Sequence, residues 1–284
     1  MSAMMAGPEE SQGPVKPTGA WARIVELNEK LWAAPTNIIE QVGTHMILFG
    51  QAVRWLFRPP FRVGILFEAM DYIGVQSLLI VSMIGLFVGM VFALQLTSAL
   101  RSLGTEGFVG ATLGIAVTRE LSPVFTAIVV AARAGAGMAT ELGSMRITEQ
   151  IDALSTLAVN PVQYLVSPRV LAGTLMVPLL SMLFVVVAML GGYGVAVYLE
   201  NVDPGVFVEN TKWLVDSKDI VQGLMKATVF GTALTLISCA QGFNASGGAK
   251  GVGIGTTRAV VGSFVTILVL DYFLTDIILV LQKK

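Results

Sequence analysis

Five charged residues interrupt stretches of sequence that are otherwise apolar. They are Arg119, Glu120, Lys226, Asp271 and Asp276. Arg119 and Glu120 are the most isolated, because twelve uncharged residues stand on each side of the pair. A charge in the middle of a bilayer costs at least about 2.5 kcal/mol, so such side chains need a cavity or a partner on another helix.

Three kinds of chemistry are open to these charges. They could relay a proton, hold a charged headgroup, or only fix helix packing as ion pairs. Asp271 could pair with Lys226 or with Arg119, and the residues alone leave both pairings open. We expect Lys226 near the outer end of its span, where a lysine can extend its ammonium group towards water.

A second group of charged residues lies in the segment 133–168. Four apolar residues recur there at helical spacing: Ile147, Ile151, Leu154 and Ala158. Arg146 and Glu149 fall on another face of that helix, and Pro161 ends it. A loop that only joined two spans could be a few residues long. We therefore expect an amphipathic helix at about 141–157 that docks to a soluble protein; a helix lying on the membrane surface is the alternative.

The sequence gives little support for metal binding, disulfide bonds or nucleotide binding. A single cysteine (Cys239) and a single histidine (His45) give no metal-ligand cluster and no disulfide framework. The glycine-rich segment 241–257 lacks the Gly-x4-Gly-Lys-Ser/Thr pattern of a phosphate-binding loop, since glycine follows Lys250. We expect this segment to be a flexible loop, and we expect no nucleotide site and no metal site on this chain.

The composition indicates the setting of these residues. Of the 284 residues, 54% are hydrophobic and 13% are charged, whereas a soluble domain carries about 25% charged residues. An all-α integral membrane protein follows, because a span needs about 20 apolar residues. Uncharged stretches predict five spans, at about 74–98, 106–133, 169–200, 220–240 and 258–283. Gly85-x-x-x-Gly89 and Gly110-x-x-x-Gly114 predict close helix packing.

The chain divides into three predicted parts. Residues 1–18 are expected to be a disordered tail, 19–60 to form amphipathic or interfacial helices, and 61–284 to form the five-span domain. The second N-terminal helix has an apolar stripe that contains Phe49 and Val53. This stripe could face the membrane interface or pack on protein, and the sequence favours neither alternative. Lys and Arg gather on one side of the spans, which predicts a cytoplasmic N-terminus and an external C-terminus.

Several motifs occur in a recognisable order. They are Gly-Met-Val-Phe-Ala-Leu-Gln ending at Gln95, Thr-Arg-Glu-Leu-Ser-Pro around Glu120, Met-Arg-Ile-Thr-Glu-Gln-Ile-Asp ending at Asp152, and Leu-Asp-Tyr-Phe-Leu-Thr ending at Thr275. In sequence and spacing this chain resembles the MlaE-type permeases, the membrane subunits of MCE-associated lipid ABC transporters. The likeness covers about residues 62–282.

The resemblance implies an interfacial helix, five membrane helices and a homodimer in the bacterial inner membrane. It also implies a cytoplasmic ABC ATPase that carries ATP and Mg, a periplasmic MCE-domain protein, and phospholipid as cargo, with no cofactor on this chain. The implied lipid path comprises Phe92, Leu94, Gln95, Arg119, Glu120 and Lys226, to which we add Asp271. The implied ATPase-coupling residues are Glu141, Arg146, Glu149 and Asp152.

Two other classes of function remain alternatives. One is a self-contained ion-coupled transporter or channel that uses Asp271, Glu120 and Lys226, although the sequence lacks the inverted repeat of many such transporters. The other is a membrane scaffold without transport activity.

Overall fold

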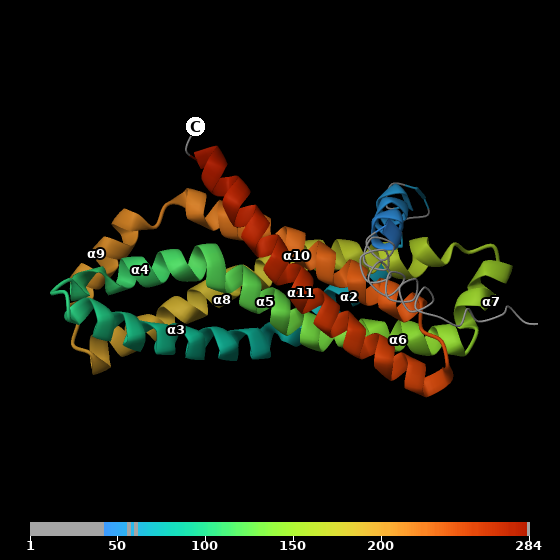
Figure 1. Cartoon of the computed structure of the whole chain (residues 1–284), viewed down its shortest axis with the longest axis horizontal. Coiled ribbons are helices and arrows are strands. Elements are labelled where there is room, and N and C mark those ends of the chain that lie inside the picture. The colour runs from blue at the N-terminus through green and yellow to red at the C-terminus, as the bar shows by residue number, and fades with distance from the viewer. Residues whose placement is uncertain (1–42, 56–57, 60–61, 283–284) are drawn as a thin grey trace, which may run out of the picture. The chain divides into compact units, whose positions relative to one another are not determined.

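The structure, a computed structural model, describes residues 43–55, 58–59 and 62–282, and this part of the chain is almost entirely helical (Figure 1). The predicted tail at 1–18 and the first predicted amphipathic helix lie outside the described residues. The chain divides into two compact units at Leu48, and the elements described below belong to the second unit, apart from the first residues of the helix at 43–55. The predicted all-α fold is confirmed.

Five helical runs in the described part are long and apolar enough to cross a membrane, as the sequence predicts. They are Val63–Arg101, Glu106–Ile147, Val162–Leu199, Ser217–Phe243 and Gly248–Leu281. The second span starts where the sequence predicts but continues past Arg133 to Ile147. The first and fourth helices exceed both of their predicted ends, whereas the third and fifth begin earlier than predicted and end within two residues of the predicted end.

Short changes of helix type divide the first three spans. The first span consists of α2 (Val63–Ile73), a 3₁₀ turn (Val75–Ser77) and α3 (Leu78–Arg101). The second consists of a 3₁₀ turn (Glu106–Phe108), α4 (Val109–Ala116), a π-helical turn (Val117–Leu121), α5 (Ser122–Val130), a π-helical turn (Ala131–Gly135) and α6 (Ala136–Ile147). The third consists of a π-helical turn (Val162–Val166), α8 (Ser167–Gly194) and a π-helical turn (Val195–Leu199).

The last two spans are single helices, α10 (Ser217–Phe243) and α11 (Gly248–Gln282). Two shorter helices stand in the connections, α7 (Gln150–Thr156) and α9 (Pro204–Leu214). Figure 1 shows α7 and α9 at opposite ends of the spans. We call these the α7 end and the α9 end.

The glycine-rich segment is mostly helical, so the predicted flexible loop at 241–257 is wrong. α10 continues to Phe243 and α11 begins at Gly248. Only four residues, 244–247, connect them, and Gly247 and Gly248 adopt positive φ angles of 85° and 69°. These two angles allow the chain to reverse within a short turn because glycine has no Cβ.

Helix α8 is the centre of the packing and contacts α2, α3 and α10. Glycines permit the closest approach: a Cβ on Gly89 of α3 would lie 2.0 Å from the carbonyl oxygen of Ala188 on α8. Gly85 likewise faces Phe184 of α8, so the first predicted small-residue motif joins two spans. The second motif joins a span to a connection, because Gly110 lies against Phe207 of α9.

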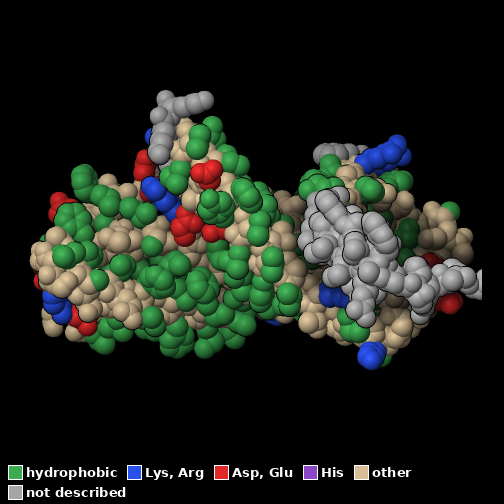
Figure 2. Space-filling view, in the orientation of Figure 1, with side chains coloured by type: hydrophobic (Ala, Val, Ile, Leu, Met, Phe, Trp, Pro, Cys, Tyr) green, Lys and Arg blue, Asp and Glu red, His purple; other side chains and the backbone are tan. Residues whose placement is uncertain are grey.

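Helix α11 lies on the outside of the second unit. It packs on α10 and α6 and crosses the other spans obliquely, and its C-terminal end stands clear of them (Figure 1). Its exposed side chains are large and apolar, for example Leu268 at 56% and Phe273 at 55% exposure. Hydrophobic side chains also cover much of the surface over the spans in Figure 2. Such a surface suits lipid or a second membrane helix.

The second predicted N-terminal helix is present, since residues 43–55 are helical. Within the second unit, Ala52 is buried and its carbonyl oxygen accepts a hydrogen bond from Ser167 Oγ at 3.0 Å. Phe49 and Val53 are exposed at 36% and 38%. The helix therefore packs on protein with one face and offers the predicted apolar stripe on another.

Candidate functional site

A buried lysine joins three spans at the centre of the candidate site. Lys226 Nζ on α10 lies 2.5 Å from Glu120 Oε2 of the second span and 2.9 Å from Asp271 Oδ1 on α11. It also donates to Thr275 Oγ1 at 2.7 Å. The Lys226 side chain is fully buried, whereas those of Glu120 and Asp271 are 40% and 23% exposed. Lys226 therefore does not extend towards water, the option that its expected place near the outer end of the span left open.

The cluster has more negative than positive charge. Two carboxylates share one ammonium group, and both carboxylates retain access to the outside of the chain. Figure 2 shows charged side chains interrupting the hydrophobic surface near the C-terminal half of α11. An anionic site with an apolar rim could hold the positive part of an amphiphile or a proton.

Arg119 forms a separate ion pair with Asp219, near the start of α10. The distance from Arg119 Nη2 to Asp219 Oδ1 is 2.7 Å, and the Asp219 side chain is 3% exposed. The other carboxylate oxygen of Asp219 accepts the backbone N–H of Asp216 at 2.9 Å and so caps α10. Of the two pairings left open for Asp271, the structure forms the one with Lys226 and not the one with Arg119.

Local helix geometry places the two adjacent charges. Arg119 and Glu120 lie in the π-helical turn Val117–Leu121, which is wider than an α-helical turn and is typical of functional sites. Asp219 and Lys226 are seven residues apart on α10 and therefore lie on one face. The two neighbouring residues of the second span thus reach two partners that are two helical turns apart.

Sequence analysis missed Asp219 because it lies at the end of an acidic connection. The signal that could have identified it is Asp216-x-x-Asp219, the spacing of a capping box at the start of a helix. That spacing moves the start of the fourth span to Ser217 and places Asp219 inside it.

We expect the replacement Arg119→Ala to destabilise the protein by up to about 3 kcal/mol, because it leaves the buried Asp219 carboxylate without its cation. This value is at the lower end for buried pairs since Arg119 is itself 32% exposed. Thermal unfolding in detergent measures the loss, and the pair Arg119→Ala with Asp219→Asn should recover most of it. A double variant as unstable as Arg119→Ala would contradict the pairing.

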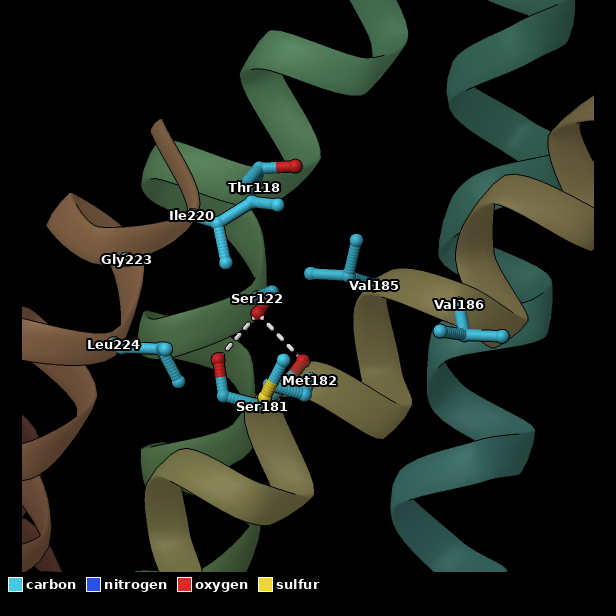
Figure 3. Close-up of a pocket in the computed structure, with 9 residues that line it drawn as sticks. All are labelled: Thr118, Ser122, Ser181, Met182, Val185, Val186, Ile220, Gly223 and Leu224. Atoms are coloured by element: carbon cyan, nitrogen blue, oxygen red, sulfur yellow. Dashed lines mark hydrogen bonds between the residues drawn. The ribbon is translucent and has the colours of Figure 1, made fainter. Parts of the chain in front are cut away.

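An apolar crevice adjoins the π-helical turn (Figure 3). Its volume is about 140 Å³, and it is lined by Thr118, Ser122, Ser181, Met182, Val185, Val186, Ile220, Gly223 and Leu224. Ser122 Oγ donates to the carbonyl oxygen of Ser181 at 2.9 Å, and the two hydroxyl groups also contact each other. Met182 and Val186 are exposed at 43% and 57%, so the crevice opens on the outer surface of the spans.

The predicted lipid-path residues of the first span lie apart from this crevice. Leu94 and Gln95 are exposed on α3, and Phe92 is partly buried against the core. Neither described cavity includes any of the three. Within one chain the structure brings together Glu120, Lys226 and Asp271, and it leaves Leu94 and Gln95 exposed on α3, apart from that cluster.

The predicted helix at 141–157 is not one helix. α6 ends at Ile147, Glu149 adopts a left-handed conformation with φ of 59°, and α7 follows. Arg146 Nη1 and Asp152 Oδ1 form an ion pair of 2.6 Å across this turn. The break turns the chain away from α6 (Figure 1), and Ile151 is buried in the same apolar cluster as Leu165 of the turn Val162–Val166.

The remaining coupling residues have different surroundings. Glu141 lies on α6 and pairs with Arg169 of α8 at 2.8 Å. Glu149 and Asp152 are exposed at the α7 end. Leu157, directly after α7, is 73% exposed. The surface open to a partner is therefore α7 with its flanking residues, and not the full predicted segment.

Five apolar helices long enough to cross a membrane, three of which meet at the buried Lys226, define a multi-pass membrane protein. Among the described residues, no group of His, Cys, Asp or Glu could hold a metal ion. The family model described as permease MlaE matches residues 66–277. The chain belongs to the MlaE permease family.

Individual relatives agree with this family. The chain is 37% identical over 253 residues to a probable ABC transporter permease protein of Rickettsia typhi, covering 85% of this chain and 98% of the relative. It is 37% identical over 256 residues to the intermembrane phospholipid transport system permease protein MlaE of Haemophilus influenzae, covering 85% and 97%. It is 35% identical over 251 residues to the chloroplastic protein TRIGALACTOSYLDIACYLGLYCEROL 1 of Arabidopsis thaliana, covering 88% and 71%.

Proposed function

We propose that this chain is the permease subunit of an ABC transporter that moves phospholipid between the inner and outer membranes, driven by an ATPase on a separate chain. The observation that carries the proposal is the similarity to the Haemophilus influenzae phospholipid permease along 85% of this chain and 97% of that protein. The chain supplies the membrane path, and ATP with Mg belongs to the partner ATPase.

The described residues offer a path for both parts of a lipid. The carboxylates of Glu120 and Asp271 give a polar position inside the spans. Leu94 on α3 and the outer face of α11 give exposed apolar surface for acyl chains. We propose that Phe92, Leu94, Gln95 and Arg119 contribute to this path when two copies of the chain meet.

We propose that the chain works as a homodimer, because the lipid path described above needs two copies of the chain. One chain carries one α7, whereas an ABC ATPase has two halves that each need a docking element. The exposed apolar faces of α3 and α11 provide surface for a second copy. We further propose that the protein lies in the bacterial inner membrane with its N-terminus in the cytoplasm, so that the α7 end faces the ATPase and the α9 end faces a periplasmic MCE-domain protein.

We expect Leu157→Asp to lower co-purification of the ATPase at least about tenfold. A carboxylate buried in an interface without a partner costs more than the roughly 1.4 kcal/mol of a tenfold change. Leu157 is 73% exposed, so the substitution should leave the fold of this chain intact. Quantitative pull-down of the assembled transporter measures the effect.

Leu103 supplies the matched control for this experiment. It has the same side chain and the same 73% exposure, but it follows α3 at the α9 end. Leu103→Asp should retain the ATPase. Equal retention by both variants would remove the docking role of α7, and equal loss would indicate a general effect on the complex.

Reconstitution tests the transport function itself. The permease and its ATPase, in vesicles that contain a fluorescent phospholipid, should move that lipid only with hydrolysable ATP, and Leu157→Asp should stop the movement. Lipid movement by the permease alone, driven by an ion gradient, would contradict the proposal and support the ion-coupled alternative. A complex whose ATPase activity does not respond to lipid would support a scaffold.

A further inference from the structure

A second cavity lies between α2, α6 and α8, on helices other than those that hold the Lys226 cluster. Its volume is about 200 Å³, and it is lined by Ile65, Glu68, Ala69, Tyr72, Ile73, Met138, Glu141 and Arg169. Unlike the crevice beside Ser122, this cavity has charged walls. Two carboxylates and one guanidinium group face the same space.

The charges in this cavity do not balance. Arg169 Nη2 pairs with Glu141 Oε1 at 2.8 Å, and the Arg169 side chain is only 14% exposed. Glu68 is exposed at the mouth of the cavity and has no ion-pair or hydrogen-bond partner among the described residues. One carboxylate is therefore left over, and a positively charged group is the ligand that it would attract.

One wall of the cavity is an aromatic ring held in a fixed position. A Cβ on Gly137 would lie 1.8 Å from Tyr72 Oη, so the hydroxyl group rests directly on the α6 backbone. The Arg133 guanidinium carbon lies 5.1 Å from the centre of the Tyr72 ring, and Arg133 also donates to the Tyr72 carbonyl oxygen. Because the Arg133 guanidinium already lies against this ring, the ring serves to bound the cavity, and the carboxylates of Glu68 and Glu141 supply the attraction for an ammonium group.

The cavity lies at the edge of the apolar part of the spans. Arg169 directly precedes 30 uncharged residues of the third span, and Asp71, one turn after Glu68, precedes 29 uncharged residues of the first. Charged side chains at that depth meet lipid headgroups, and the bilayer core begins beyond them. The ligand available there is a lipid.

We propose that this cavity binds the headgroup of a phospholipid that carries a primary ammonium, the phosphatidylethanolamine class. The ammonium group is held by Glu68 and Glu141 beside the Tyr72 ring, and Arg169 lies next to the lipid phosphate. A primary ammonium has three N–H donors for these acceptors, whereas a trimethylated headgroup has none. The inference requires only that the chain spans a membrane and is independent of the transport reaction.

Native mass spectrometry of the full chain in nanodiscs made from equal parts of ethanolamine, choline and glycerol phospholipids tests the proposal. Ethanolamine lipid should be retained over choline lipid. Glu68→Gln should lower that preference roughly tenfold, the change expected for losing one charge-assisted hydrogen bond. The substitution removes no ion pair among the described residues, so size-exclusion and thermal-unfolding profiles should stay unchanged.

Asp71→Asn is the matched control. Asp71 lies on the same helix, is exposed, and contacts Gln76 at 3.1 Å outside the cavity. The variant Asp71→Asn should retain the wild-type preference for ethanolamine lipid, whereas Gly137→Ala should weaken that preference by displacing Tyr72. Equal retention of the ethanolamine and choline lipids, or equal effects of Glu68→Gln and Asp71→Asn, would overturn the site. Displacement of the lipid by free ethanolamine at comparable concentration would overturn its assignment to a lipid.

Discussion

Lys226→Met should destabilise the folded permease by about 3–5 kcal/mol and abolish lipid transport. Removing one partner of a buried ion pair leaves an uncompensated charge in a medium of low polarity. The substitution removes two ion pairs at once, because Lys226 is the shared partner of Glu120 and Asp271. Thermal unfolding in detergent and ATP-driven lipid transfer in vesicles measure the two effects separately.

A neutralised cluster separates stability from transport. The triple variant Lys226→Met, Glu120→Gln, Asp271→Asn carries no charge, so it should recover most of the lost stability. If the charges serve the lipid path, the triple variant should fold and still fail to transport. If transport is restored together with stability, the cluster serves only helix packing, and its role in transport is contradicted.

Gly89→Ala should cost at least about 3 kcal/mol, the upper end of the range for overpacking, although it adds only one methyl group. The new Cβ would lie 2.0 Å from the carbonyl oxygen of Ala188, and 2.6 Å from the carbonyl carbon. Both atoms belong to the backbone of α8, which cannot move away locally as the end of a flexible side chain can. The helices must therefore separate, and the whole core between α3 and α8 loosens.

Gly194→Ala is the control for this substitution. Gly194 lies on α8, and a Cβ there would have no described atom within 4 Å. Because alanine favours a helix over glycine by about 1 kcal/mol, this variant should be as stable as the wild type or slightly more stable. Similar losses of thermal stability in the two variants would contradict the close α3–α8 contact.

The spans are predictable from sequence because a long uncharged stretch has few alternatives to crossing a membrane. Their ends are less predictable, since a charged residue suggests an end even where folding satisfies it. At Arg133 the sequence predicts the end of the second span, yet the guanidinium group donates to Ser77 Oγ and to the Tyr72 carbonyl oxygen. Because these groups of the first span bind the Arg133 guanidinium, the second span does not end at Arg133 and continues to Ile147.

The candidate site is predictable in its residues but not in its contacts. Glu120, Lys226 and Asp271 are identifiable because isolated intramembrane charges are costly. Their pairing depends on a π-helical turn and on the register of α10, and neither has a local signal in the apolar sequence. The break at Glu149 is hidden for a similar reason, because its left-handed conformation is set by the surrounding fold and not by glycine or asparagine.

The Lys226 cluster also bears on how the protein is made. Glu120 is synthesised 106 residues before the lysine that neutralises it, and Asp271 follows that lysine by another 45. Until the fourth span is inserted, the Glu120 carboxylate of the second span therefore lacks its cation. Helix α11 then adds Asp271 and Thr275 to a lysine that Glu120 already neutralises, so a polypeptide truncated before α11 keeps one ion pair and lacks the other two contacts of Lys226.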